Sequence, residues 1–243
     1  MESASLLLIQ VGTPPETIRT AHGDLPVWFT RALACEPASV QVVRVFEGDP
    51  LPPPDARRVA IITGSWAMVT ERLPWSERTA EWIRAAMAIN MPLFGVCYGH
   101  QLMAHALGGE VDYHPRGREI GCHQIRLRPE AKSDPMLSGL PPRFAAHLTH
   151  MQSIIRLPPG AEALADSDHD AFQIVRYGPY ALSTQFHPEF TAEILAAVIT
   201  MRADLLRAEG KDPDALLQAL GGTPHATRLM QDFVTAAVAP PAA

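Results

Sequence analysis

The segment 92–101 constrains the fold of this chain more than any other part of the sequence. It reads PLFGVCYGHQ, so an apolar run leads to Cys97, with Gly95 two residues before the cysteine and Gly99 two residues after it. Glycine inside a strand or helix costs about 0.5–1 kcal/mol, so two such glycines indicate a tight turn from strand to helix. The helix dipole and the free N–H groups at the helix start favour a thiolate there. We therefore predict that Cys97 is a nucleophile.

A second signal is the sequence QFHPE at 185–189, which ends another apolar run. His187 and Glu189 are two residues apart, and such residues face the same side of an extended strand. An imidazole beside the thiol raises the thiolate fraction and can later donate a proton to a leaving amine. A carboxylate that holds the imidazole in one tautomer completes a triad. The sequence therefore predicts a catalytic triad of Cys97, His187 and Glu189.

A tetrahedral intermediate at the nucleophile also needs hydrogen-bond donors for its negatively charged oxygen. The backbone N–H of Tyr98, directly after the cysteine, is one candidate. The turn at Gly64 and Ser65, which follows a buried-looking apolar run, is the other. We predict these three residues as the oxyanion-binding elements.

The first hundred residues alternate between strand-like and helix-like patterns. Such alternation is typical of βαβ units with a parallel sheet, and active sites in these sheets gather at the carboxyl ends of the strands. Gly64, Cys97 and His187 each follow a predicted strand. The predicted strands are 6–11, 40–46, 58–63 and 92–96, and the predicted helices are 25–34 and 75–87.

The rest of the chain has a different pattern. Strands separated by short turns are predicted within 108–127, 144–157 and 172–186, several of them antiparallel. From residue 191 onward we predict helices with breaks near 210–213 and 221–224, and a frayed tail over 239–243. We find no internal repeat and no linker. The prediction is a single domain over 1–243, with a core of about 5–195 and a C-terminal helical extension of about 191–238.

Composition narrows the class of protein. The chain has 243 residues, 47% of them hydrophobic, and a net charge of −6 without a long run of like charges, so neither a nucleic-acid nor a membrane surface is indicated. No apolar run reaches the roughly 18 residues of a membrane helix, and the first residues are typical of a strand rather than a signal peptide. The three cysteines form no CxxC pair. We predict a soluble cytoplasmic protein.

Several polar residues fit structural roles better than chemical ones. Cys35 and Cys122 are predicted as small buried core residues. His147 and His150 lie three residues apart, and Cys122 adjoins His123, but neither pair belongs to a four-ligand zinc pattern. We therefore predict no metal and no cofactor. His100, on the helix after the nucleophile, is expected to pack rather than to act as a second base.

Taken together, three motifs resemble those of class I glutamine amidotransferases. GVCYGHQ at 95–101, followed by Leu102, Ala104, Gly108, Gly109 and Val111, resembles the family's nucleophile region. TGS at 63–65 resembles its oxyanion strand, and QFHPE at 185–189 matches its His-Pro-Glu signature. The resemblance spans roughly residues 5–195 and is greatest to stand-alone domains similar to the glutaminase part of GMP synthetase. It implies an α/β, flavodoxin-like fold: a mostly parallel central sheet, flanking helices and a small antiparallel sheet.

The resemblance also implies a reaction and a substrate site. The reaction is hydrolysis of the side-chain amide of glutamine through a γ-glutamyl thioester on Cys97, with release of ammonia. Gln101 would contact the bound glutamine. Residues 118–121, REIG, resemble an Arg-Glu-aromatic-Gly element near that pocket. The residues where the family binds the α-amino and α-carboxyl groups are Thr149, His150, Met151 and Gln152.

Two departures leave alternatives open. Met151 stands where strong glutaminases usually have glycine, and no Ser-Gly-Gly-type or Gly-Lys-[Ser/Thr] phosphate loop occurs. An ammonia acceptor would therefore be supplied by a separate synthetase chain. One alternative is a γ-glutamyl peptide or γ-glutamyl amine hydrolase that transfers no ammonia. Another is a catalytically quiet binding or regulatory protein, although all three triad residues are present.

Overall fold

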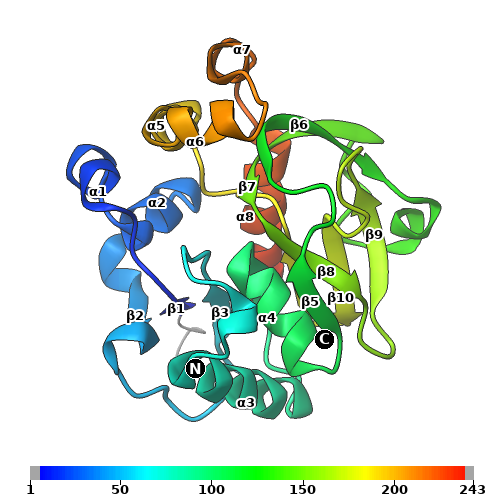
Figure 1. Cartoon of the computed structure of the whole chain (residues 1–243). Helices are drawn as coiled ribbons and strands as arrows, with labels where there is room; N and C mark the ends of the chain where they lie inside the picture. Colours follow the sequence, from blue (N-terminus) through cyan, green and yellow to red (C-terminus); the bar gives the residue numbers. More distant parts are fainter. Residues whose placement is uncertain (1–5, 239–243) are drawn as a thin grey trace.

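A nine-stranded mixed sheet forms the centre of the molecule. The computed structural model describes residues 6–238, and the strand order is β2-β1-β3-β4-β11-β10-β9-β6-β7 (Figure 1). Its strands are β1 Leu6–Gln10, β2 Val40–Arg44, β3 Val59–Ile62, β4 Leu93–Val96, β6 Glu119–Leu127, β7 Arg143–His150, β9 Glu162–Asp166, β10 Ile174–Gly178 and β11 Ala181–Thr184. A separate two-stranded antiparallel sheet pairs β5 Glu110–Tyr113 with β8 Gln152–Arg156.

The sheet has a parallel half and an antiparallel half. Strands β2, β1, β3, β4 and β11 are mutually parallel, in the order typical of flavodoxin-like folds. Strands β10, β9, β6 and β7 continue the sheet through antiparallel pairs. The predicted fold class, a mostly parallel central sheet with flanking helices and a small antiparallel sheet, is confirmed.

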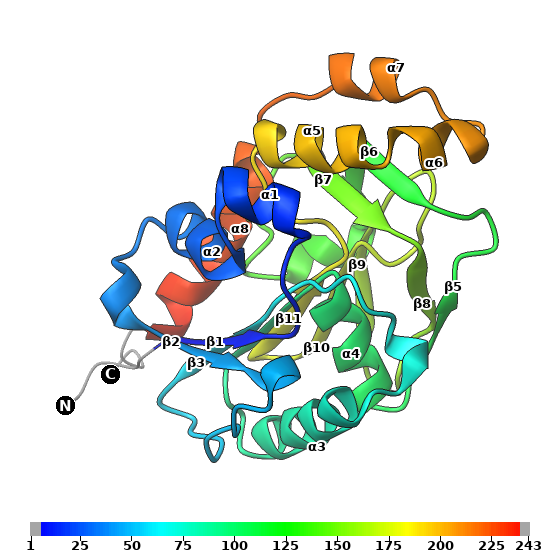
Figure 2. The same cartoon turned by 60° about the vertical axis from the view of Figure 1, so that its left-hand side comes forward.

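Helices cover both faces of the parallel half. They are α1 Glu16–His22, α2 Leu25–Ala32, α3 Pro74–Ala88, α4 Tyr98–Ala106, α5 Ala192–Met201, α6 Ala203–Ala208, α7 Pro213–Gln218 and α8 Pro224–Val238. Helices α3 and α4 lie on one face, and α2 and α8 lie on the other (Figure 2). Alternation along the strands explains this arrangement: Leu6 and Leu8 of β1 pack on the α2 and α8 side, whereas Leu7 and Ile9 pack on the α3 and α4 side.

The sequence prediction missed two elements. Strand β9 has the sequence EALAD, which lacks β-branched residues, and it is held by pairing with β10 and β6. Helix α1 has seven residues, no side-chain cap at its N-terminus, and Ile18 as its buried residue. Both depend on tertiary contacts rather than on local propensity.

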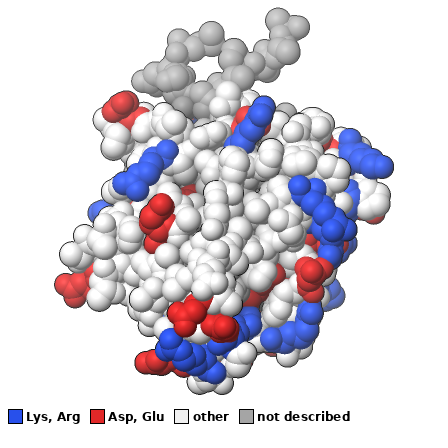
Figure 3. Space-filling model, turned by 90° about the horizontal axis from the view of Figure 1, so that it is seen from above, with Lys and Arg blue, Asp and Glu red and all other residues white. Residues whose placement is uncertain are grey.

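The C-terminal helices follow the predicted breaks. Helix α6 ends at Ala208 and α7 begins at Pro213, and the second break falls between α7 and α8. A further break at Arg202, between α5 and α6, was not predicted. The predicted frayed tail lies outside the described residues. On the side of the molecule that carries α7, acidic and basic side chains are interspersed (Figure 3). Within residues 6–238, no helix combines the length and the apolar character that a membrane crossing requires.

Candidate active site

Cys97 lies at a strained turn between β4 and α4. Its backbone φ is 50° and its ψ is −99°, a conformation that residues other than glycine rarely adopt. The flanking glycines make the turn possible. A Cβ on Gly95 would lie 2.7 Å from the carbonyl oxygen of Gly99, and a Cβ on Gly99 would lie 2.3 Å from that of Ile62. The predicted elbow is therefore present, and both glycines are required by close backbone approach.

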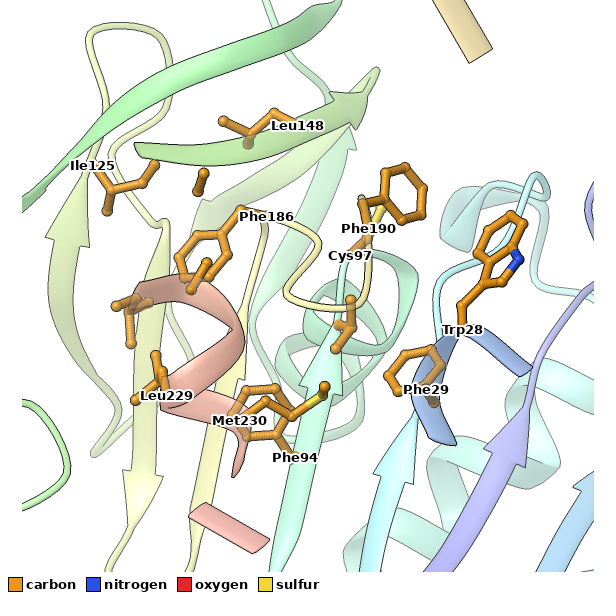
Figure 4. Packing of buried hydrophobic residues seen from close by; sticks show 14 of the residues in the cluster. Trp28, Phe29, Phe94, Cys97, Ile125, Leu148, Phe186, Phe190, Leu229 and Met230 are labelled. Carbon is orange, nitrogen blue, oxygen red and sulfur yellow. The ribbon is translucent and has the colours of Figure 1, made fainter. Parts of the chain in front are cut away.

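His187 and Glu189 lie in the turn that follows β11. The His187 Nδ1 and Glu189 Oε1 atoms are 2.8 Å apart, and both side chains are buried. This contact does not arise from strand alternation as predicted, because β11 ends at Thr184. Two other contacts fix the turn. The His187 N–H donates to the carbonyl of His147 at 2.9 Å, and the Phe190 ring stacks on the imidazole with 4.0 Å between the ring centroids. Phe190 lies beside Cys97 in the same packed region (Figure 4).

Electrostatic coupling between Cys97 and His187 favours a thiolate and an imidazolium. Burial by itself raises the pKa of Cys97, but the interaction with the nearby His187 imidazole outweighs burial, so the net pKa is lowered. Burial by itself lowers the pKa of His187, but Glu189 and Cys97 raise it to about 10. Because Nδ1 faces Glu189, Nε2 is the nitrogen left for the thiol and for a leaving group.

The predicted oxyanion residues lie around the nucleophile. A Cβ on Gly64 would lie 3.1 Å from the His187 ring and 3.7 Å from the Cys97 Cβ atom. Ser65 and Tyr98 line the same cleft as Cys97. The Tyr98 hydroxyl points elsewhere, since it is 2.7 Å from the Ser76 hydroxyl, and burial raises its pKa to about 12. The phenol is thus a packing group, and the backbone N–H is the part of Tyr98 available to a ligand.

The predicted substrate residues line one continuous cleft with Cys97. They are Gln101, Thr149, His150, Met151 and Gln152. Gln101 Nε2 donates to the carbonyl of Gln152 at 2.6 Å and to Gln185 Oε1 at 2.9 Å. Gln152 Nε2 in turn donates to the Thr70 hydroxyl at 2.5 Å. The structure brings these residues together through side-chain hydrogen bonds between α4, β8 and the loop after β3.

A buried ion pair supports this cleft from behind. The His150 Nε2 and Glu119 Oε2 atoms are 2.8 Å apart, and both side chains are almost fully buried. Ser167 and Gln173 also donate to the Glu119 carboxylate, at 2.7 and 2.9 Å. Burial raises the pKa of Glu119, but the hydrogen bond and the charge of His150 lower it to about 2. Glu119 therefore fixes the ring of His150, whose Nδ1 is 2.9 Å from the carbonyl of Gln152.

Two arginines also reach the cleft, and only one of them lay in a predicted motif. Arg118 pairs with Glu209 at 3.2 Å and places Nη2 2.9 Å from the sulfur of Met151. Arg202 donates from Nη1 to the Thr149 hydroxyl at 3.3 Å. Arg202 belongs to the C-terminal helices, outside the three motifs, so no sequence signal pointed to it. The cleft beside the thiol therefore contains positive charge from two distant segments.

The other histidines and cysteines considered in the sequence lie outside the chemistry of the cleft. His100 is fully buried, with Nδ1 2.7 Å from the Ser183 hydroxyl, as a packing residue would be. His147 contacts the carbonyl of Gly221 at 2.9 Å. Cys35 and Cys122 are only partly buried, so the prediction that they are buried core residues is wrong. Within residues 6–238, no group of three His, Cys, Asp or Glu residues is placed to hold a metal ion.

This geometry agrees with similarity to known proteins. The family described as glutamine amidotransferase class-I matches residues 30–200 of the chain. The chain is 34% identical, over 141 residues and 57% of its length, to a glutamine-hydrolysing GMP synthase subunit of Ignicoccus hospitalis, of which 71% is covered. The chain therefore belongs to the class I glutamine amidotransferase family.

The chain is also similar to a peptidase in sequence and to a solved structure in fold. Gamma-glutamyl peptidase 5 of Arabidopsis thaliana is 32% identical over 109 residues, which are 44% of this chain and 43% of the peptidase. A glutamine amidotransferase from Thermotoga maritima has the same fold, with a TM-score of 0.77, 22% identity, and coverage of 98% of this chain and 99% of that one. The chain spans a quarter or less of the length of three other glutamine-hydrolysing GMP synthases that it matches.

Proposed function

We propose that this protein hydrolyses γ-glutamyl amides, with the side-chain amide of glutamine as the first substrate, through a thioester on Cys97. The observation that carries the proposal is the strained Cys97 turn placed against a His187 ring that Glu189 holds at 2.8 Å. A buried thiolate and imidazolium side by side are poised for acyl transfer.

Each residue has a role in the proposed mechanism. The Cys97 thiolate attacks the side-chain carbonyl carbon, and the N–H groups at Gly64 or Ser65 and at Tyr98 bind the negatively charged oxygen. His187 then protonates the leaving nitrogen, and the carbon–nitrogen bond breaks. A water molecule, deprotonated by His187, hydrolyses the thioester and releases glutamate. Gln101 and residues 149–152 would hold the α-amino and α-carboxyl groups.

The fate of the ammonia depends on a second protein in this proposal. The relative from Ignicoccus hospitalis is named as one component of a synthase, and this chain carries no phosphate loop of its own. We propose that a separate synthetase chain accepts the ammonia. A second candidate substrate is a γ-glutamyl peptide, which needs no acceptor. It is supported by Met151 in the cleft and by the similarity to a γ-glutamyl peptidase.

The test is release of glutamate from glutamine and from a γ-glutamyl peptide, comparing wild type with Cys97→Ser. We expect the variant to lose at least about 10³-fold in rate. Cys35→Ser is the matched control, because Cys35 lines a different surface hollow, and it should retain full activity. Wild-type rates in Cys97→Ser would overturn the mechanism. If the wild type hydrolyses neither substrate, the alternative of a catalytically inactive binding or regulatory protein would be favoured.

A further inference from the structure

Arg202 occupies a junction in the backbone that turns its side chain toward the nucleophile. Helix α5 ends at Met201 and α6 begins at Ala203, and Arg202 between them has a ψ of 10°. Its N–H still bonds to the carbonyl of Val198 at 3.1 Å. From this position its Nη1 reaches Thr149 of β7. The break that was not predicted is therefore what brings a guanidinium from the C-terminal helices to the cleft.

The cleft extends to both sides of Cys97, and Arg202 borders both. One side, here called the acyl side, is lined by Gln101, Met151 and Gln152. The other, here called the amine side, is lined by His187. In the proposed mechanism His187 protonates the leaving nitrogen, so the leaving group lies on the amine side.

Beside the polar residues Ser65, His187 and Glu189, the amine side has apolar walls that ammonia, as a leaving group, would not contact favourably. Leu25, Trp66 and Phe190 give this side apolar walls, and Arg202 closes it. Ammonia is small and polar, so neither an apolar wall nor a guanidinium would help its departure. An amine that carries both an apolar side chain and a carboxylate would contact all of these groups.

The charge balance of the cleft also indicates an anionic ligand. Arg118 has Glu209 as its ion-pair partner, but in the described part of the chain no carboxylate lies within 4.0 Å of the Arg202 guanidinium. Burial, followed by repulsion from Arg118, lowers the pKa of Arg202 to about 10, so Arg202 is still a cation at neutral pH. The Cys97 thiolate and Glu209 act on Arg202 only through longer-range attraction, and a half-buried guanidinium without a carboxylate in direct contact binds a ligand carboxylate well. Glu189 also borders this side: its Oε1 is bound to His187, and its buried Oε2 has no hydrogen-bond partner among the described residues.

We propose that Arg202 binds a carboxylate on the leaving group, and that, of the two candidate substrates named above, γ-glutamyl dipeptides whose second residue has an apolar side chain are preferred to glutamine. This inference rests on the proposed hydrolysis at Cys97. The thiolate forms a carbon–sulfur bond to the γ-glutamyl carbonyl carbon, the carbon–nitrogen bond breaks, and its electron pair takes the proton of His187. Water then cleaves the thioester, so the products are glutamate and the free amino acid.

The test compares two substrates that differ only in the carboxylate: γ-glutamyl-leucine and γ-glutamyl-isoamylamine. In wild type we expect a higher kcat/KM for γ-glutamyl-leucine. In Arg202→Gln, kcat/KM for γ-glutamyl-leucine should fall about 10–100-fold more than for the isoamylamine compound, mainly through KM. Arg202→Lys should restore part of the preference because it keeps the charge. Arg207→Gln, on the exposed side of α6, is the matched control and should change neither value.

Equal losses on both substrates would overturn the proposal, because Arg202 would then act on the shared γ-glutamyl part or on folding. Binding to the Cys97→Ser protein, measured by calorimetry, separates this proposal from the reaction itself. If wild type turns over neither of these compounds nor glutamine, the proposed function fails. The carboxylate site would still be supported if the Cys97→Ser protein binds γ-glutamyl-leucine more tightly than γ-glutamyl-isoamylamine and the double variant Cys97→Ser, Arg202→Gln does not. Equal affinity for the two compounds would remove it.

Discussion

The parallel and antiparallel halves of the sheet organise the candidate site by different physical means. In the parallel half, the backbone positions the site: β4 ends in a strained turn, and the close approach of Gly99 to the backbone of Ile62 fixes the position of Cys97. In the antiparallel half, side chains position the site: Glu119 of β6 and His150 of β7 form a buried pair that supports the cleft. The first arrangement depends on close steric packing of the backbone, and the second depends on charge and hydrogen bonds.

This difference teaches where each kind of variation is tolerated. A strained backbone turn is disturbed when a single methyl group is added, because the closely packed backbone around it must shift. A polar network fails when one acceptor is replaced, since the remaining buried donors lose their partners. The turn after β11 belongs to both kinds, since His187 takes its position from the backbone and its charge from Glu189.

Glu189→Gln should have the largest effect on the chemistry. An amide in place of the carboxylate no longer stabilises the imidazolium or selects its tautomer, so we expect kcat to fall about 10⁴-fold. The ion pair of thiolate and imidazolium exists above the pKa of Cys97 and below that of His187, which is about 10. Because Glu189 raises the pKa of His187, the alkaline limb of the kcat/KM profile should move to lower pH in the variant.

Steady-state kinetics across the pH range on wild type and variant would measure both effects. Glu193→Gln is the matched control, because Glu193 is an exposed carboxylate at the start of α5. It should leave the rate and the alkaline limb in place. An unshifted alkaline limb in Glu189→Gln would show that Glu189 does not control the charge of His187.

Glu119→Gln should have the next largest effect, and on stability first. The carboxylate accepts bonds from His150, Ser167 and Gln173, and an amide offers only one accepting oxygen. We expect a loss of about 3 kcal/mol in the free energy of unfolding, measured by chemical denaturation. Glu110→Gln, an exposed partner of Arg156, is the control and should change stability by less than about 1 kcal/mol.

The pH dependence of that loss follows from the two pKa shifts. The pKa of Glu119 is lowered from 4.5 to about 2. Its contribution to the free energy of unfolding is therefore complete above pH 4.5 and disappears as the pH falls through 2. Although burial lowers the pKa of His150, Glu119 raises it above 6.5 overall, so the contribution of His150 is complete below 6.5 and disappears at higher pH. The difference between wild type and variant should be greatest between these values. A difference that does not vary with pH would contradict the ion pair.

The sequence allowed prediction of the parts of the site that local sterics determine. The Cys97 turn and the pair of His187 and Glu189 each involve residues close in sequence, so motif spacing was sufficient. The Glu119 and His150 pair joins β6 to β7, and only their resemblance to a family element placed them near the pocket. Arg202 could not be predicted, because its position depends on where α5 breaks and on how the C-terminal helices pack above β7.

Gly99→Ala tests the steric side of the comparison and should have the smallest effect of the three. The added methyl group would lie 2.3 Å from the carbonyl oxygen of Ile62, so β3 and α4 must move apart. We expect a loss of about 1–3 kcal/mol in stability together with reduced thiol reactivity, because the same movement displaces the turn at Cys97. Gly139→Ala is the control, since a Cβ there meets nothing within 4 Å. If alanine at 99 leaves both denaturation and the alkylation rate of Cys97 at wild-type values, the turn does not depend on close packing, and the contrast between the two halves of the sheet fails.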